Sequence, residues 1–241
     1  MRILAWNIRG GGREGIADAV KAIAPDVAVL SDCRPSHHIG LVALLRESGF
    51  EWVVGTNRAD VTGLLIASRT PLQPGPTSSR VLPAHWCHVW LPDRHLSLVG
   101  IYGPLRGMAP VNPVQPFWAE LAEAAEGLRG GAAILIGDLN TAAAPRDKTT
   151  EGALPAAKNL RRLLDDGWRD AFREANGDQM AYSYRDGRGE YRIDHALLSP
   201  SAPTTQRAEY IDAIAGLSLS GWPRSLAAPA LSDHAALVID V

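Results

Sequence analysis

Short apolar runs alternate with amphipathic segments at the start of the chain. Residues 2–6 and 26–30 are mostly apolar and read as strands. Residues 16–24 and 39–47 place apolar side chains three and four positions apart, which predicts helices with one buried face. Strands that alternate with helices in this way indicate an α/β fold.

The middle of the chain changes character, because strand-like runs follow one another there with little helix between them. We expect these runs to form antiparallel sheet, and they cover residues 51–55, 63–68, 86–91 and 96–102. Further elements are predicted as a helix at 117–128, a strand at 132–136, a helix around 160–164, and strands at 193–198 and 235–241. The segments predicted as loops are 71–79, 103–116, 141–155, 200–206 and 216–230.

This pattern predicts one domain over residues 1–241, since no part of the chain would hold a complete core without the rest. Many short strands with inserted helices favour two packed sheets whose outer faces are covered by helices. The predicted fold class is therefore an α/β sandwich with two mixed or antiparallel sheets flanked by helices.

Composition and charge narrow the classes of protein that fit. The chain has 241 residues, 46% of them hydrophobic and 21% charged, which is typical of a folded globular protein. Its net charge of -2 excludes a strongly basic protein that coats DNA, so phosphate contacts must be local or mediated by a metal. Cys33 and Cys87 are too few for a disulfide framework, and no signal peptide or membrane-length apolar run is present. We therefore expect a reduced, cytoplasmic monomer without a membrane partner.

Polar residues that can bind metals or transfer protons stand where the apolar strands end. The set comprises Asn7, Asp32, Asp138, Asn140, Asp194, Asp233 and His234. Asp138 and Asn140 are two positions apart, so in a continued strand their side chains point to the same face. Carboxylate and amide oxygens suit a hard cation such as Mg²⁺, and a histidine beside a carboxylate provides a base near neutral pH. These groups are the parts of a metal-assisted hydrolysis of a phosphoester.

Six short motifs follow one another along the whole chain, five of them at these strand ends and one around Tyr102. They are Ile3-Leu4-Ala5-Trp6-Asn7, Val29-Leu30-Ser31-Asp32, Ile101-Tyr102-Gly103-Pro104, Ile136-Gly137-Asp138-Leu139-Asn140, Tyr191-Arg192-Ile193-Asp194 and Leu231-Ser232-Asp233-His234. Each motif alone is common, but all six in this order resemble the endonuclease/exonuclease/phosphatase superfamily, which includes exonuclease III and pancreatic deoxyribonuclease. The resemblance implies a four-layered α/β sandwich with the site at one end of the paired sheets.

The resemblance also implies roles for individual residues. The resemblance implies that Mg²⁺ or Mn²⁺ is held by Asp32, Asn7 and Asp233. As catalytic residues it implies Tyr102 at the phosphate or leaving group, Asp138 and Asn140 at the attacking water, and Asp194 and His234, as a pair, at the phosphoryl oxygens.

Asp32 departs from the superfamily pattern, because most members have Glu at this position. The Asp carboxylate is one methylene shorter, so its oxygens retreat by roughly 1.5 Å, one carbon–carbon bond length. Metal then binds through a water, or more weakly, or the backbone shifts to compensate. A catalytically weakened binding module on the same fold is therefore an alternative to a working enzyme.

The favoured function is a divalent-metal-dependent phosphodiesterase that hydrolyses nucleic acid, with DNA as the expected partner. A cationic rim in the neighbouring loops would bind phosphates without changing the net charge, and its candidates are Arg9, Arg13, Arg58, Arg106, Arg146, Lys148, Arg185 and Arg188. Candidates for a wall on which bases stack are Tyr182, Tyr184 and Trp222. The alternative is a phosphatase or phosphodiesterase that acts on a small-molecule or lipid phosphoester.

Overall fold

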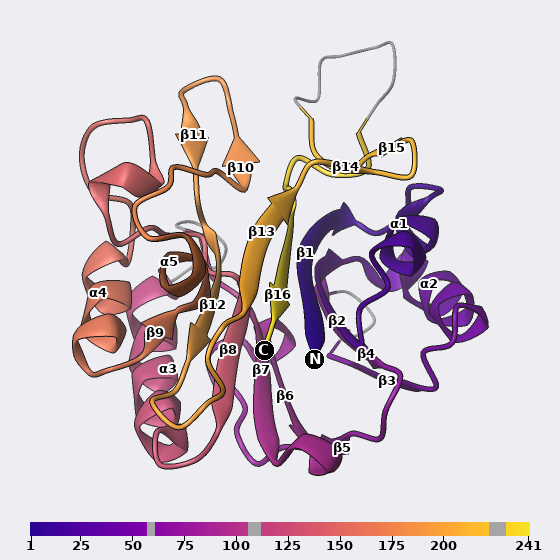
Figure 1. Cartoon of the computed structure of the whole chain (residues 1–241), viewed down its shortest axis with the longest axis horizontal. Helices are drawn as coiled ribbons and strands as arrows, with labels where there is room; N and C mark the ends of the chain where they lie inside the picture. Colours follow the sequence, from indigo (N-terminus) through magenta and orange to yellow (C-terminus); the bar gives the residue numbers. More distant parts are fainter. Residues whose placement is uncertain (57–60, 106–111, 222–229) are drawn as a thin grey trace.

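Two six-stranded sheets lie face to face in this computed structural model, which describes residues 1–56, 61–105, 112–221 and 230–241 (Figure 1). In spatial order, the first sheet consists of β13 (Arg207–Ile211), β16 (Ala236–Asp240), β1 (Arg2–Gly10), β2 (Val27–Cys33), β4 (Gly63–Ser68) and β3 (Trp52–Gly55). The second sheet consists of β5 (Gln73–Pro74), β6 (Trp86–Leu91), β7 (Leu96–Tyr102), β8 (Ala133–Asp138), β12 (Asp194–Leu198) and β9 (Arg169–Asp170).

Each sheet has one pair of parallel strands at its centre. β1 and β2 are parallel and are joined through helix α1 (Ile16–Ile23), and β7 and β8 are parallel and are joined through helix α3 (Val114–Leu128). β16 and β12 run antiparallel to β1 and β8, respectively. The carboxyl ends of each parallel pair therefore lie at the same edge of their sheet as the amino end of the antiparallel neighbour.

Three apolar layers hold the strands and helices together. In β1, Ile3 and Ala5 belong to the layer between the sheets, whereas Leu4 and Trp6 pack towards α1 and α2 (Pro35–Glu47). Alternate residues of a strand point to opposite faces, so a strand covered on both faces has a continuous apolar sequence. The outer face of the second sheet packs against α3 and α4 (Ala157–Asp165). The predicted four-layered α/β sandwich is confirmed.

Helix α5 (Ala171–Asn176) closes one side of the sandwich. It lies beside β12 of the second sheet and β13 of the first (Figure 1), and its Ala171 and Phe172 extend the layer between the sheets. Two short hairpins stand at the end of the sandwich where β1 finishes (Figure 1). They are β10 (Tyr184–Arg185) with β11 (Glu190–Tyr191), and β14 (Ala213–Ile214) with β15 (Leu217–Ser218).

The structure divides or extends several predicted elements. The strands between residues 51 and 102 pair antiparallel as predicted, but β3 and β4 belong to the first sheet and β5, β6 and β7 to the second. Helix α3 begins at Val114, inside a segment predicted as a loop, and β5 and β15 also lie in such segments. β13 and α5 were not predicted, because β13 is a partly exposed strand of mixed polarity and α5 has only 6 residues.

The sequence predicts no disulfide framework for the two cysteines and no membrane-spanning length for the helices, and the structure describes both features. Cys33 and Cys87 are both buried, and no disulfide joins them. Burial raises the pKa of Cys87 to about 12, so its thiol is not a nucleophile near neutral pH. Among the helices of the described residues, none has the length and apolar character needed to cross a membrane.

Candidate active site

Asn7, in the last part of β1, and Asp138, the last residue of β8, join the two sheets. Both side chains are buried, and Nδ2 of Asn7 donates a hydrogen bond of 2.9 Å to Oδ2 of Asp138. The backbone N–H of Arg9 donates to Oδ1 of Asn7 over 3.0 Å, which leaves this oxygen a second lone pair. The Asn7 carboxamide thus orients the Asp138 carboxylate from the facing sheet.

His234 lies between two carboxylates. Its Nδ1 is 2.8 Å from Oδ2 of Asp194 and its Nε2 is 3.9 Å from Oδ2 of Asp138, and all three side chains are buried. Asp194 begins β12 and His234 precedes β16, so the hydrogen bond between them connects the two sheets. Since Asp194 holds Nδ1, the other ring nitrogen faces Asp138.

The loop that carries His234 is tied to β1. The hydroxyl of Ser232 donates to the Asn7 carbonyl over 2.6 Å and accepts from the backbone N–H of His234 over 3.1 Å. The indole N–H of Trp6 donates to the His234 carbonyl over 2.9 Å. Two residues of the first motif therefore hold the last motif of the chain beside them.

Asn140 reaches the site by a turn and not by continuation of β8. The strand ends at Asp138, and Asn140 has a φ of 50°, in the left-handed region that Asn tolerates. Its backbone N–H donates to Oδ1 of Asp138 over 2.9 Å, and its Nδ2 donates to the Gly103 carbonyl over 2.8 Å. The predicted continued strand is wrong, since β8 ends at Asp138, but the turn still brings the two side chains together, with Nδ2 of Asn140 3.3 Å from Oδ2 of Asp138.

Asp32 occupies an irregular end of β2. The register of β2 with its neighbours shifts before Cys33, and Asp32 has a φ of 55°. Burial raises the pKa of Asp32 to about 6, although the nearby Arg34 guanidinium opposes this shift. The Asp32 carboxylate has no hydrogen-bond or ion-pair partner among the residues that the structure describes. Asp233, on the same cavity, forms an ion pair of 3.7 Å with Nε of Arg9.

Tyr102 is held by a residue that the sequence did not single out. The ring of His85 stacks on the Tyr102 ring at a centroid distance of 4.6 Å, and Nδ1 of His85 is 2.7 Å from the Tyr102 carbonyl oxygen. Burial lowers the pKa of His85, so the ring is neutral and donates from Nδ1. Burial and the nearby Asp32 and Asp138 carboxylates raise the pKa of Tyr102, which keeps its O–H protonated.

The pKa values of Asp138 and His234 are both raised. Burial raises the pKa of Asp138, and the Asp194 carboxylate raises it further. Burial alone would lower the pKa of His234, but the Asp194 and Asp138 carboxylates outweigh it and raise the pKa to about 9. His234 therefore carries the proton near neutral pH and offers an N–H donor from Nε2.

A cavity of about 530 Å³ gathers the predicted site residues. All of them line it apart from Asp194, which is fully buried behind His234. The members are Asn7, Asp32, Tyr102, Asp138, Asn140, Asp233 and His234. The rest of the wall is cationic at Arg9, Arg34 and Arg188, acidic at Asp186, and apolar or aromatic at Leu105, Leu154, Pro155, Tyr184, Tyr191 and Ile193.

The predicted cationic rim is only partly present. Arg9 and Arg188 line the cavity, and Arg34, which was not predicted, joins them. The other described members interact elsewhere: Arg146 with Asp178, Arg185 with Glu190, Arg13 with the Ala230 carbonyl, and Lys148 with the Thr150 carbonyl. Of the predicted stacking wall, Tyr184 lines the cavity and Tyr182 does not. Arg58, Arg106 and Trp222 lie outside the described residues.

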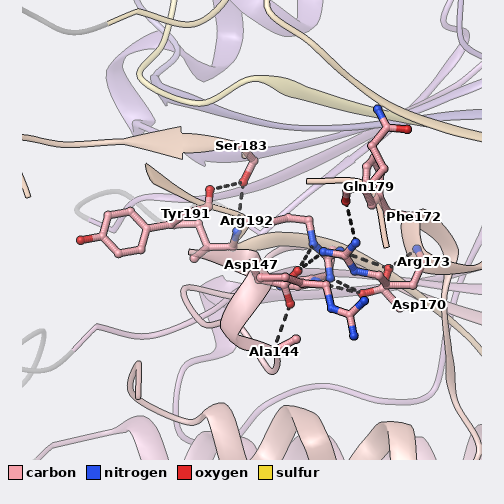
Figure 2. Close-up of polar contacts among 12 residues, drawn as sticks. Ala144, Asp147, Asp170, Phe172, Arg173, Gln179, Ser183, Tyr191 and Arg192 are labelled. Carbon is pink, nitrogen blue, oxygen red and sulfur yellow. Dashed lines mark hydrogen bonds and ion pairs between the residues drawn. The ribbon is translucent and has the colours of Figure 1, made fainter. Parts of the chain in front are cut away.

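A buried ion cluster supports the connection between β11 and β12, which leads into Asp194 (Figure 2). Arg192 is 1% exposed, and its guanidinium donates to Asp147 over 2.8 Å and to both oxygens of Asp170 over 3.1 and 2.7 Å. Arg173 also pairs with Asp147. The sequence showed Arg192 as part of a motif, but its partners lie 45 and 22 residues away. An arginine inside an apolar strand pattern is the signal that such partners exist.

Comparison with known proteins agrees with this geometry. Residues 4–234 match the model of the Endonuclease/Exonuclease/phosphatase family. No curated protein matches the chain in sequence.

Solved structures share the fold over the full chain. An AP endonuclease from Archaeoglobus fulgidus has a TM-score of 0.77 and 18% identity, covering 100% of this chain and 98% of that chain. The 3′ phosphatase NExo from Neisseria, bound to product DNA hairpin, has a TM-score of 0.77 and 21% identity, covering 100% and 98%. The 3′-5′ exonuclease NExo from Neisseria meningitidis has a TM-score of 0.75 and 22% identity, covering 100% and 99%.

Proposed function

Because the chain belongs to the endonuclease/exonuclease/phosphatase family, we propose that it is a metal-dependent phosphodiesterase that hydrolyses nucleic acid. The observation that carries the proposal is the content of the 530 Å³ cavity. It combines a carboxylate that has no hydrogen-bond or ion-pair partner among the described residues, an aspartate and an asparagine joined by hydrogen bonds, and a protonated histidine held by a second aspartate. These are the groups that phosphoester hydrolysis requires.

The surroundings of Asp32 fit a divalent cation with oxygen ligands. Its half-buried carboxylate lacks a partner among the described residues, and Asp233 and Oδ1 of Asn7 offer further oxygens in the same cavity. Ligand atoms of Asp138, Asp194 and His234 also lie within 4.8 Å of one another. We assign the cation to Asp32, Asn7 and Asp233, since Asp194 and His234 already bind each other. When bound, Mg²⁺ or Mn²⁺ supplies Lewis-acid polarisation of a phosphoryl oxygen.

Asp138 and Asn140 act on the attacking water. Asp138, oriented by Asn7, takes a proton from the attacking water, whose oxygen forms the new bond to phosphorus as the ester oxygen leaves. Because Nδ2 of Asn140 is held by the Gly103 carbonyl, Oδ1 of Asn140 is the acceptor for that water.

Two donors complete the proposed arrangement around the phosphate. Nε2 of His234 donates to a phosphoryl oxygen, where negative charge develops. The protonated phenol of Tyr102, which lines the same cavity, donates to the leaving oxygen.

The cavity wall favours nucleic acid over a small phosphate compound. Beside the polar groups it presents Leu154, Pro155 and Ile193, and the rings of Tyr184 and Tyr191, whose centroids are 6.1 Å apart. Such surfaces bind the faces of sugars and bases, and arginines at the rim bind neighbouring phosphates. The similar solved structures are described as an AP endonuclease, a 3′ phosphatase with a DNA hairpin and a 3′-5′ exonuclease, which supports DNA as the substrate.

The first prediction tests the substrate class directly. Purified protein should cleave labelled single-stranded, duplex or abasic DNA in the presence of Mg²⁺ or Mn²⁺, and EDTA should abolish the cleavage. Asp138→Asn should be inactive under the same conditions, which rules out a contaminating nuclease. Turnover of a phosphomonoester or a phospholipid, with no cleavage of any DNA or of RNA, would transfer the assignment to a small-molecule or lipid phosphoester.

The second prediction concerns metal binding at Asp32. Asp32→Asn should weaken Mg²⁺ binding, measured by calorimetry, by about 10-fold or more, because it removes the charged oxygen ligand. Asp32→Glu should leave activity equal or lower, since the irregular end of β2 sets the reach of the shorter carboxylate. Asp93→Asn, at an exposed position, is the control. Higher turnover in Asp32→Glu would instead favour a catalytically weakened binding module.

A further inference from the structure

The outer edge of β12 loses its neighbouring strand before it reaches Asp194. β12 pairs with β8 from Asp194 to Leu198, but it pairs with β9 only at Leu197 and Leu198. Asp194 is fully buried, so its backbone N–H and carbonyl need partners other than water.

Two side chains provide those partners. The hydroxyl of Ser183 accepts from the backbone N–H groups of Ile193 and Asp194 over 3.0 and 3.1 Å. The phenol of Tyr210 donates to the Asp194 carbonyl over 2.7 Å. Ser183 is 2% exposed and lies beside the segment that follows Tyr191 (Figure 2). Side-chain oxygens thus replace the missing strand at this point.

Ser183 and Tyr210 also contact the segment that follows His234. The Ser183 carbonyl accepts from the backbone N–H of Ala235 over 2.7 Å. Tyr210 belongs to β13 in the first sheet and pairs with Leu237 of β16, the strand that follows His234. Ser183 and Tyr210 therefore connect the backbone of Asp194 to the backbone next to its hydrogen-bond partner.

The Asp194 carboxylate depends on such backbone support. Its Oδ2 is hydrogen-bonded to His234, whereas its buried Oδ1 has no partner among the described residues. Within the described part of the chain, no second hydrogen bond fixes the carboxylate, so a displacement of the Asp194 backbone would be transmitted to the imidazole. Displacements of about 1 Å are enough to cost large factors in rate.

We propose that Ser183 and Tyr210 are positioning residues that set the geometry of the Asp194–His234 pair. Neither is among the described residues that line the 530 Å³ cavity, so both act through the pair and not on the substrate. The proposal rests on the proposed function only for its effect on turnover. Its structural part, the hydrogen bond between Asp194 and His234, is measurable without a substrate.

The test compares Ser183→Ala and Tyr210→Phe, each of which removes one oxygen atom. Each should lower kcat on DNA by about 10-fold and leave KM within about 2-fold, the pattern for a support that acts behind the reacting groups. In proton NMR at fixed pH, the low-field signal of the His234 Nδ1 proton should weaken or vanish in both variants, because the bond to Asp194 is longer. Ser183→Thr should restore both readouts, since it returns the hydroxyl and a cavity of about 40 Å³ borders this residue.

Ser199→Ala is the matched control. Ser199 is equally buried near the other end of β12, where its hydroxyl accepts from Ala133 N–H over 2.9 Å and donates to the Gly131 carbonyl over 2.7 Å. This variant should lose stability as Ser183→Ala does, with kcat and the His234 signal unchanged. An unchanged signal in both Ser183→Ala and Tyr210→Phe, or equal kcat losses in the Ser199 and Ser183 variants, would overturn the proposal. Wild-type protein that cleaves no phosphoester would refute the proposed function, while the NMR comparison would still decide the positioning.

Discussion

Replacing His234 with alanine should lower kcat on DNA by about 10²–10⁴-fold, the range for an oriented acid, base or electrostatic stabiliser. The expectation follows from the position of His234 between Asp194 and Asp138, 2.8 and 3.9 Å away, where its protonated ring faces the cavity. Asp194→Asn should be severe as well, because a neutral amide neither raises the pKa of the ring nor holds it as a carboxylate does. Steady-state kinetics with Mg²⁺ measures both losses.

The double variant shows whether the two residues act as one unit. Since Asp194 acts through the imidazole, adding Asp194→Asn to His234→Ala should cost little beyond the single change at His234. His95→Ala, at an exposed position, should leave turnover unchanged. Losses that multiply fully would refute the pairing, and near wild-type turnover in His234→Ala would refute the mechanism.

The largest expected effect on stability comes from Arg192→Leu. The substitution removes the guanidinium that is bound to Asp170 and Asp147 and leaves two buried carboxylates with too few partners. Removing one member of a buried ion pair typically costs about 3–5 kcal/mol, so the free energy of unfolding should fall by that amount. Urea denaturation at pH 7 measures it, with Arg162→Leu as an exposed control that should change it by less than about 0.5 kcal/mol.

The pH dependence of this loss has a defined sign. Burial alone would raise the carboxyl pKa values of Asp147 and Asp170, but Arg192 outweighs burial and holds both below their ordinary range. Carboxyls with depressed folded-state pKa values stabilise the protein above their unfolded pKa of about 3.9 and lose that contribution as the pH falls. The difference between wild type and Arg192→Leu should therefore shrink as the pH is lowered from about 7 towards 3. A difference that stays constant over this range would show that the charges of these carboxylates contribute little.

Local sequence patterns were sufficient to predict the main strands, the family and the site residues that line the cavity. The mostly apolar run at 2–6 predicted a strand, and the structure shows that this strand is covered on both faces. The ordered motifs predicted the family, and the polar strand ends predicted which side chains gather in the cavity. The assignment of metal to Asp32 and of proton transfer to Asp138 remains a prediction.

Only the tertiary structure could show what supports these residues, because their partners are remote and unmarked in the sequence. No sequence pattern marks Ser183 or Tyr210. Their hydrogen bonds to the Asp194 backbone arise because the short strand β9 leaves the edge of β12 unpaired there. Likewise, β13 has a sequence of mixed polarity, and its strand conformation depends on pairing with β16. The sequence by itself determined the fold class and the candidate site residues, since hydrophobic periodicity and short motifs are local properties. The geometry between those groups was decided by the packing of two sheets, which brings together residues such as Asp194 and His234 that are 40 positions apart.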